Sequence, residues 1–122
     1  MRANRVECVG AMMAESGKLE RAYSFTRDYG KVYSGTLNDS KLTSCPLDTN
    51  GSTSANKQTY TVTVNSTKTT YTIVAIPIGR QAQDSCGGLA LTHLGEKKSG
   101  VSDSTGASAA HNNDAIAAAC WR

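Results

Sequence analysis

Four cysteines and two histidines are the residues of this sequence with the most distinctive chemistry. They are Cys8, Cys45, Cys86, Cys120, His93 and His111. No two cysteines have the close spacing of a typical zinc site, so the pattern does not favour a bound metal. Cysteines without metal spacing are typical of exported proteins, in which they form disulfides. We therefore expect two disulfides, whose pairing the spacing leaves open, and no metal site.

Hydrolytic catalysis would need a nucleophile held beside a histidine and an acid. His93, His111 and Asp114 stand among many serines, but no nucleophile elbow and no phosphate-binding loop frames them. His93 falls in a predicted strand and His111 in a polar segment, where surface histidines are common. We therefore expect a protein that is not an enzyme and needs no cofactor.

A group of acidic and amide residues carries the oxygen ligands that calcium prefers. They are Asp103, Asn112, Asn113 and Asp114. Their spacing matches no EF-hand, and the same residue types are common in solvated turns. A calcium site in this segment is therefore an alternative and not the main expectation.

A basic patch for nucleic acid is the remaining candidate, formed by Lys97 and Lys98 with Arg80 and Arg122. The formal net charge is only +3, with charges of both signs spread along the chain, which is a weak indication of such binding. Aromatic residues suited to base stacking are better placed in the core or as anchors. These aromatic residues are Tyr60, Tyr71 and Trp121.

The length of 122 residues predicts one domain, 1–122, because domains cluster at about 100 to 150 residues. The 13 Ser, 14 Thr and 11 Gly favour β-structure and loops and exclude an all-helical bundle. No apolar run approaches the ~18 residues of a membrane span, and the first residues lack a signal-peptide core. Because disulfides require export, we expect that an export element has been removed from the natural N-terminus.

Helical periodicity dominates the N-terminal segment and predicts an amphipathic helix over 2–29. Charged residues separate the apolar ones, and Gly30 is the expected left-handed cap at the helix end. The apolar residues at helical spacing are Val9, Met12, Met13, Leu19 and Tyr23.

Glycine, proline and hydroxyl residues make 30–57 an irregular helix-to-sheet loop. A connection of this length is usually held in place, so we expect Cys45 to pin it and a short helix near 38–42.

Alternating apolar and polar residues then predict an antiparallel sheet over 58–94. The expected strands are a hairpin of 59–64 with 69–78, whose second strand is apolar on both faces, and a third strand over 88–94. The remaining residues, 95–122, read as a C-terminal loop with an apolar anchor at its end.

Several of these segments together resemble type IV pilins, and most closely PilE-like minor pilins. The resemblance covers nearly the whole chain, and the Cys-Gly-x-Leu-x-Leu strand and the terminal Cys-Trp are its most specific parts. The residues that carry it are Glu20–Tyr23, Gly30, Tyr33, Tyr71–Pro77, Gln81–Leu91, Gly95 and Cys120–Trp121.

The resemblance implies an α+β pilin fold, with a long N-terminal amphipathic helix packed on a three- to four-stranded antiparallel sheet. It further implies a C-terminal D-region bounded by a disulfide between Cys86 and Cys120. Cys8 and Cys45 depart from the usual family pattern, and by elimination they pair with each other unless both are free buried thiols.

In type IV pilins an apolar first half of the helix anchors the subunit in the inner membrane and later in the filament core. That half is missing here, so the chain itself is expected to be soluble. The resemblance implies a structural subunit, a minor pilin that acts in pilus assembly and in twitching motility, adhesion or DNA uptake. We expect it on the pilus at the surface of a Gram-negative bacterium.

The implied partners are other pilin subunits, the inner-membrane assembly machinery through the missing helix half, and a surface or DNA target. No small-molecule substrate is expected. The alternative function is a type II secretion pseudopilin or a tip adhesin, in which the loop 96–119 holds calcium or another ligand.

Overall fold

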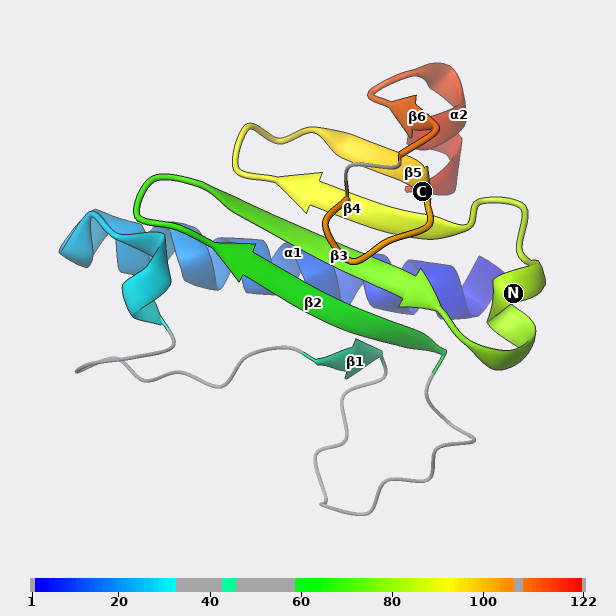
Figure 1. The fold of residues 1–122 in the computed structure, drawn as a ribbon, viewed down its shortest axis with the longest axis horizontal. Coiled ribbons are helices and arrows are strands. Elements are labelled where there is room, and N and C mark those ends of the chain that lie inside the picture. The colour runs from blue at the N-terminus through cyan, green and yellow to red at the C-terminus, as the bar shows by residue number, and fades with distance from the viewer. Residues whose placement is uncertain (1, 33–42, 46–58, 107–108, 122) are drawn as a thin grey trace, which may run out of the picture.

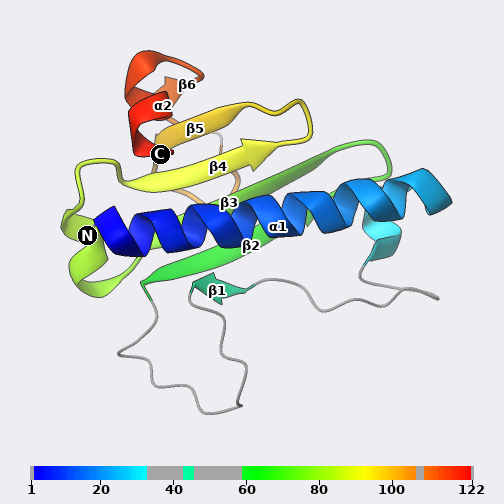
Figure 2. The ribbon, with the colours of Figure 1, turned by 180° about the vertical axis from the view of Figure 1, so that it is seen from behind.

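A long helix lies along one face of an antiparallel sheet, and a short helix sits at the far edge of that sheet (Figures 1 and 2). The computed structural model describes residues 2–32, 43–45, 59–106 and 109–121. Its helices are α1 (Arg2–Thr26), the 3-10 helices η1 (Tyr29–Val32) and η2 (Gly79–Gln83), and α2 (Ala115–Cys120). Its strands are β1 (Ser44–Cys45), β2 (Tyr60–Ser66), β3 (Tyr71–Pro77), β4 (Gly88–Thr92), β5 (Lys97–Val101) and β6 (His111–Asn112).

The sheet has six antiparallel strands in the order β1-β2-β3-β4-β5-β6. The predicted hairpin is confirmed: β2 and β3 pair along their whole length, from Tyr60 opposite Pro77 to Ser66 opposite Tyr71. The alternation of threonine with apolar residues sets this register, because a shift by one residue would turn the apolar side chains away from the helix.

The sheet is larger than the predicted three or four strands. The segment 95–122, expected to be a loop, contains β5, β6 and α2, and Cys45 lies in β1 instead of an irregular loop. Local pattern does not mark β5, because it begins with two lysines and contains Gly100 at a φ of 67°. Pairing with β4 supplies the hydrogen bonds that make it a strand.

Helix α1 buries an apolar stripe against the sheet, which confirms the predicted burial of Met12 and Leu19. Met13, in contrast, is 46% exposed, and Val9 and Tyr23 are only partly buried. The stripe consists of Cys8, Met12, Leu19 and Ala22, all buried. Among the helices in the described part of the chain, none combines the length and the apolarity that crossing a bilayer requires.

The helix ends at Thr26, earlier than the predicted residue 29, and Arg27 instead of Gly30 adopts the left-handed conformation, with a φ of 57°. The Arg27 N–H donates to the carbonyl of Tyr23, closing the last turn. The Thr26 hydroxyl accepts from the Asp28 N–H and the Asp28 carboxylate accepts from the Gly30 N–H, so side chains turn the backbone early.

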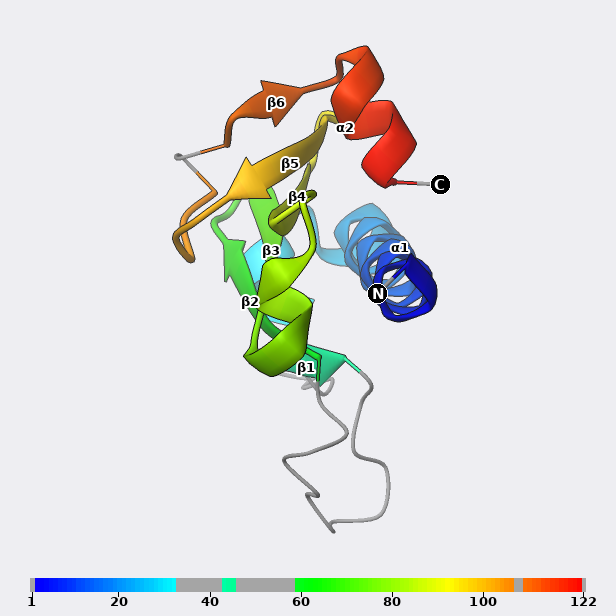
Figure 3. The same ribbon diagram turned by 90° about the vertical axis from the view of Figure 1, so that its right-hand side faces the viewer.

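Both faces of β3 are covered, as its apolar residues on both faces predict (Figure 3). Tyr71, Ile73 and Ala75 belong to the core beneath α1. On the other face, Val74 packs in a smaller cluster. Gly106, in the segment between β5 and β6, lies so close to this face that a Cβ added to it would be 3.4 Å from Val74 Cγ2. The short helix expected near 38–42 lies outside the described residues.

Candidate functional site

The four cysteines join elements that are distant in the chain. Cys8 in α1 is bonded to Cys45 in β1, with their α-carbons 5.3 Å apart. Cys86, before β4, is bonded to Cys120 at the end of α2, with their α-carbons 5.8 Å apart. These are the pairs that the resemblance and elimination led us to expect. All four are buried, so the disulfides hold the structure together and present no accessible thiol chemistry.

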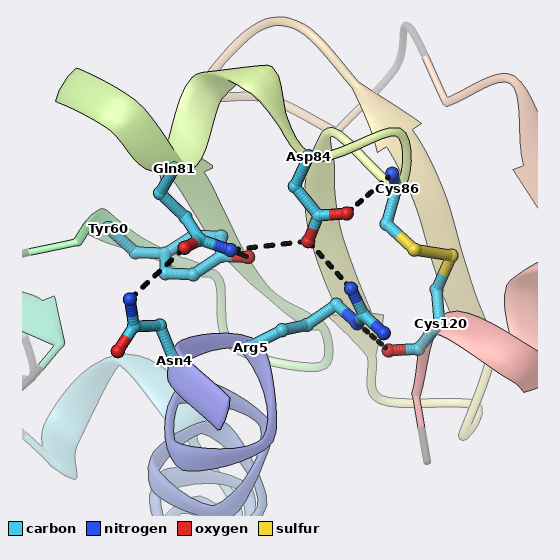
Figure 4. Close-up of polar contacts among 7 residues, drawn as sticks. All are labelled: Asn4, Arg5, Tyr60, Gln81, Asp84, Cys86 and Cys120. Carbon is cyan, nitrogen blue, oxygen red and sulfur yellow. Dashed lines mark hydrogen bonds and ion pairs between the residues drawn. A yellow bond between two sulfur atoms is a disulfide. The ribbon is translucent and has the colours of Figure 1, made fainter. Parts of the chain in front are cut away.

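A buried polar network joins the first turns of α1 to η2 and to the C-terminal disulfide (Figure 4). Arg5 Nη1 donates to Asp84 Oδ2 at 2.6 Å, and Arg5 Nε donates to the carbonyl of Cys120 at 3.0 Å. Gln81 Nε2 donates to the Tyr60 hydroxyl and to the same Asp84 oxygen. The Arg5 and Asp84 side chains are only 11% and 7% exposed. We call the group of Arg5, Gln81, Asp84 and Cys120 the anchored end.

The opposite end of α1 carries exposed cations that we call the basic end, defined by Arg27, Lys31 and Lys68. Two backbone hydrogen bonds assemble it: Arg27 N–H donates to the Tyr23 carbonyl at 2.8 Å, and Tyr29 N–H donates to the Lys68 carbonyl at 3.2 Å. The second bond joins η1 to the turn between β2 and β3, two segments that lie side by side in both views (Figures 1 and 2). Three separate turns therefore present the three cations.

Three tyrosines pack together beside the basic end and hold η1 in place. Tyr23 and Tyr29 are stacked with ring centroids 4.3 Å apart, and Tyr29 meets Tyr71 edge-on at 4.9 Å. The Tyr29 hydroxyl donates to Glu20 Oε1 at 3.1 Å. Burial and this hydrogen bond raise the pKa of Tyr29 to about 12. The tyrosines fix η1 against the sheet, and so they fix the backbone that carries the cations.

Within the described part of the chain, no carboxylate forms an ion pair with a cation of the basic end. All three cationic side chains are exposed. The nearest acidic residues along the chain have other partners: Asp28 Oδ1 accepts from the Gly30 N–H at 2.8 Å, and Glu20 accepts from Tyr29. Both carboxylates keep their negative charge, so the basic end presents three exposed cations beside two acids, a small net positive charge that a polyanion could contact.

The basic patch considered as a candidate from the sequence has its described members in different parts of the fold. Arg80 lies in η2 beside the anchored end, whereas Lys97 opens β5 alongside the last residues of β4. The Trp121 indole donates to the Lys98 carbonyl at 2.9 Å, which places the chain end near β5, and Arg122 lies outside the described residues. Arg80 and Lys97 therefore lie toward opposite ends of β4, which agrees with the weak indication for this patch in the sequence.

The aromatic side chains expected in core or anchoring positions are there: Tyr60, Tyr71 and Trp121 are buried. They are unavailable for stacking on a bound base.

His111 and Asp114 form an exposed pair, with Nδ1 and Oδ2 2.9 Å apart. Asp114 Oδ1 also accepts from the Ala117 N–H and caps α2. The bond to the backbone and the contact with His111 lower the pKa of Asp114. Asp114 therefore caps α2, and His111 contacts the capping carboxylate.

The residues considered for calcium form turns and strand ends. Asp103 Oδ1 accepts from the backbone of Thr105 and of Gly106, and Asn113 Oδ1 accepts from the backbone at the start of β5. Across residues 2–32, 43–45, 59–106 and 109–121, no group of three His, Cys, Asp or Glu side chains is arranged to hold a metal ion.

The basic end was missed from the sequence because its members come from two distant segments. Arg27 and Lys31 flank the helix end, and Lys68 stands in a hairpin turn. The backbone bond between Tyr29 and Lys68, together with the packing of Tyr29 on Tyr71, brings them together. The available signal was two cations around a helix end, which is weak by itself because cations are common there.

Residues 1–90 match the model of a family described as type IV minor pilin ComP, DNA uptake sequence receptor. The matched range includes all three cations of the basic end and stops before Lys97. Comparison with curated proteins finds no match.

Proposed function

Because the chain belongs to the ComP family of type IV minor pilins, we propose that it is a pilus subunit that binds double-stranded DNA for uptake through its basic end. The observation that carries the proposal is the family match over residues 1–90, whose description names a DNA receptor. The basic end lies wholly within that range and offers the matching charge.

DNA binding by such a site rests first on phosphate contacts. Duplex DNA carries about one negative charge per 1.7 Å of its axis, and each lysine or arginine that contacts a phosphate releases condensed counterions. Arg27, Lys31 and Lys68 extend from short turns on a packed base, so their backbone positions are set before DNA arrives. Such contacts fix the position of the duplex, whereas base contacts would add sequence preference.

As a pilin, the subunit would assemble with other pilin subunits and with the inner-membrane machinery, and it would be displayed on the pilus at the cell surface. Roles in pilus assembly, twitching motility or adhesion belong to the same proposal. The described residues support a structural role: two disulfides and a buried ion pair fasten the helix and the C-terminal segment to the sheet.

The test is the affinity of the chain for a fluorescein-labelled duplex, measured by anisotropy at low salt. We expect Lys31→Ala with Lys68→Ala to weaken binding by roughly tenfold, because two phosphate contacts are lost. The matched control is Arg80→Ala with Lys97→Ala, which removes the same charge from exposed positions outside the basic end. Equal losses in the two variants would show that net charge, and not the basic end, determines binding.

A further inference from the structure

An aromatic side chain two residues before Arg27 of the basic end is exposed to solvent. Phe25, the single phenylalanine of the sequence, lies in the last turn of α1 with 82% of its surface exposed. It belongs to neither hydrophobic cluster. Among the aromatic residues whose burial the structure describes, it is the one that is mostly exposed; Tyr23 is partly buried, and the other tyrosines and the tryptophan are buried.

Two exposed arginines lie near Phe25 in the chain. Arg21 precedes it by four residues and therefore lies on the same face of α1, and Arg27 follows it at the helix end. The Arg21 guanidinium lies back over Gly17, where an added Cβ would be 3.5 Å from Nη1, so it leaves the ring of Phe25 uncovered. An exposed aromatic ring near exposed arginines is a combination that binds single-stranded nucleic acid by base stacking and phosphate contacts.

We propose that Phe25 is a stacking platform for an unpaired base at the end, or in an overhang, of DNA held by the basic end. This inference rests on the proposed DNA binding and adds a preference for unpaired strands. Inside a duplex, each base has its faces against its neighbours. A ring on the convex surface of a helix therefore meets a base face where the strand is unpaired.

The positive charge near Phe25 favours DNA, and not a second copy of this chain, as the partner that contacts this side chain. A second copy that placed its own Phe25 there would bring together two regions of net positive charge, and like charges would oppose the contact. The net charge is positive because Arg21, Arg27, Lys31 and Lys68 outnumber Glu20 and Asp28. A polyanion is attracted by the same net charge.

The experiment compares three labelled DNAs: a hairpin duplex in which non-nucleotide linkers replace the loop and cap the blunt end (the blunt hairpin), the same duplex with a ten-nucleotide overhang in place of the cap, and the single strand alone. We expect the wild-type chain to favour the overhang over the blunt hairpin. Phe25→Ala should remove this preference and weaken single-strand binding by roughly tenfold, because base–aromatic stacking is lost. Its affinity for the blunt hairpin should stay within about twofold.

The matched control is Ile116→Ala, which removes an exposed apolar side chain from α2. It should leave binding to all three DNAs unchanged. Phe25→Trp keeps the stacking surface and adds a reporter, since the other tryptophan, Trp121, is buried. We expect its fluorescence to be quenched by the overhang DNA and not by the blunt hairpin.

Hairpin binding with no effect of Phe25→Ala on the overhang would overturn this inference and leave the proposed function standing. Failure to bind any of the three DNAs would overturn both. A fall in self-association on Phe25→Ala, with DNA binding intact, would assign the ring to a contact between copies and would likewise overturn the inference.

Discussion

At the first turns of α1, Arg5 is buried and meets Asp84 at 2.6 Å, whereas just past the last turn Arg27 is exposed without a carboxylate partner in the described residues. In the anchored end, the Arg5 guanidinium donates to Asp84, which directly follows η2, and to the carbonyl of Cys120 in α2. The basic end instead uses its hydrogen bonds to position the backbone and leaves the charges to solvent.

The difference separates stability from binding. Removing a partner from a buried ion pair is strongly unfavourable, while exposed charges contribute little to folding. Substitutions at the anchored end should therefore change the free energy of unfolding, and substitutions at the basic end should change DNA affinity. The predictions below test this division from the largest expected effect to the smallest.

Asp84→Asn should lower the free energy of unfolding by about 3 to 5 kcal/mol, because the Arg5 charge would remain buried without its counter-charge. Urea denaturation followed by circular dichroism measures the change. Replacing both residues together, Arg5→Met with Asp84→Leu, should cost less than Asp84→Asn alone. A loss below 1 kcal/mol for Asp84→Asn would mean that the ion pair does not anchor the helix.

Removal of the C-terminal disulfide by Cys86→Ser with Cys120→Ser should cost about 3 to 4 kcal/mol, from the entropy of a closed loop of 34 residues. Thermal unfolding measures this loss of stability, and hydrogen exchange of the α2 amides shows whether the C-terminal segment is released. Removing the other disulfide should instead release β1 and leave the exchange of α2 unchanged. If α2 stays protected without Cys86 and Cys120, the disulfide is not what holds the C-terminal segment.

Arg27→Gly should raise the free energy of unfolding by about 1 kcal/mol, because glycine adopts the left-handed conformation without steric cost. The same change should weaken DNA binding by removing a cation. Arg21→Gly, in the helix interior, should be destabilising by about 1 kcal/mol. If Arg27→Gly both stabilises the fold and weakens DNA binding, the Arg27 side chain serves DNA contact and not folding. Any other combination of results argues against that role.

Tyr29 should ionise with a pKa of about 12 in the folded chain, measured by phenolate absorbance. The folded pKa lies above the unfolded value near 10, so the fold favours the neutral phenol. This contribution is complete below pH 10 and is lost as the pH rises toward 12. Glu20→Gln should lower the pKa of Tyr29. Titration near pH 10 in the folded wild type would contradict the packed aromatic base.

The local sequence was sufficient to predict an element where one repeating pattern of apolar residues runs through the whole of it. The alternation in β2 and β3 predicts the hairpin, and the spacing of Met12 and Leu19 predicts the buried face of α1. It failed where partners decide the structure: β5 is a strand because β4 pairs with it, although Gly100 interrupts its pattern. The early end of α1 depends on the side chain of Asp28, which periodicity does not detect.

The candidate site was harder to predict than the fold. Family resemblance implied one disulfide and elimination the other, but no motif links Arg27 to Lys68. Their proximity depends on the tyrosine packing and on one backbone bond. Lys97 and Lys98 drew attention because they are adjacent in the chain, which says little about what lies adjacent in space.

The salt dependence of duplex DNA binding tests the central claim most directly. The slope of log K against log salt counts the phosphate contacts, at about 0.9 per contact. For the variant that combines Arg27→Gly, Lys31→Ala and Lys68→Ala, the account predicts a slope shallower than that of the wild type by roughly 2 to 3. An unchanged slope would contradict the assignment of DNA binding to the basic end.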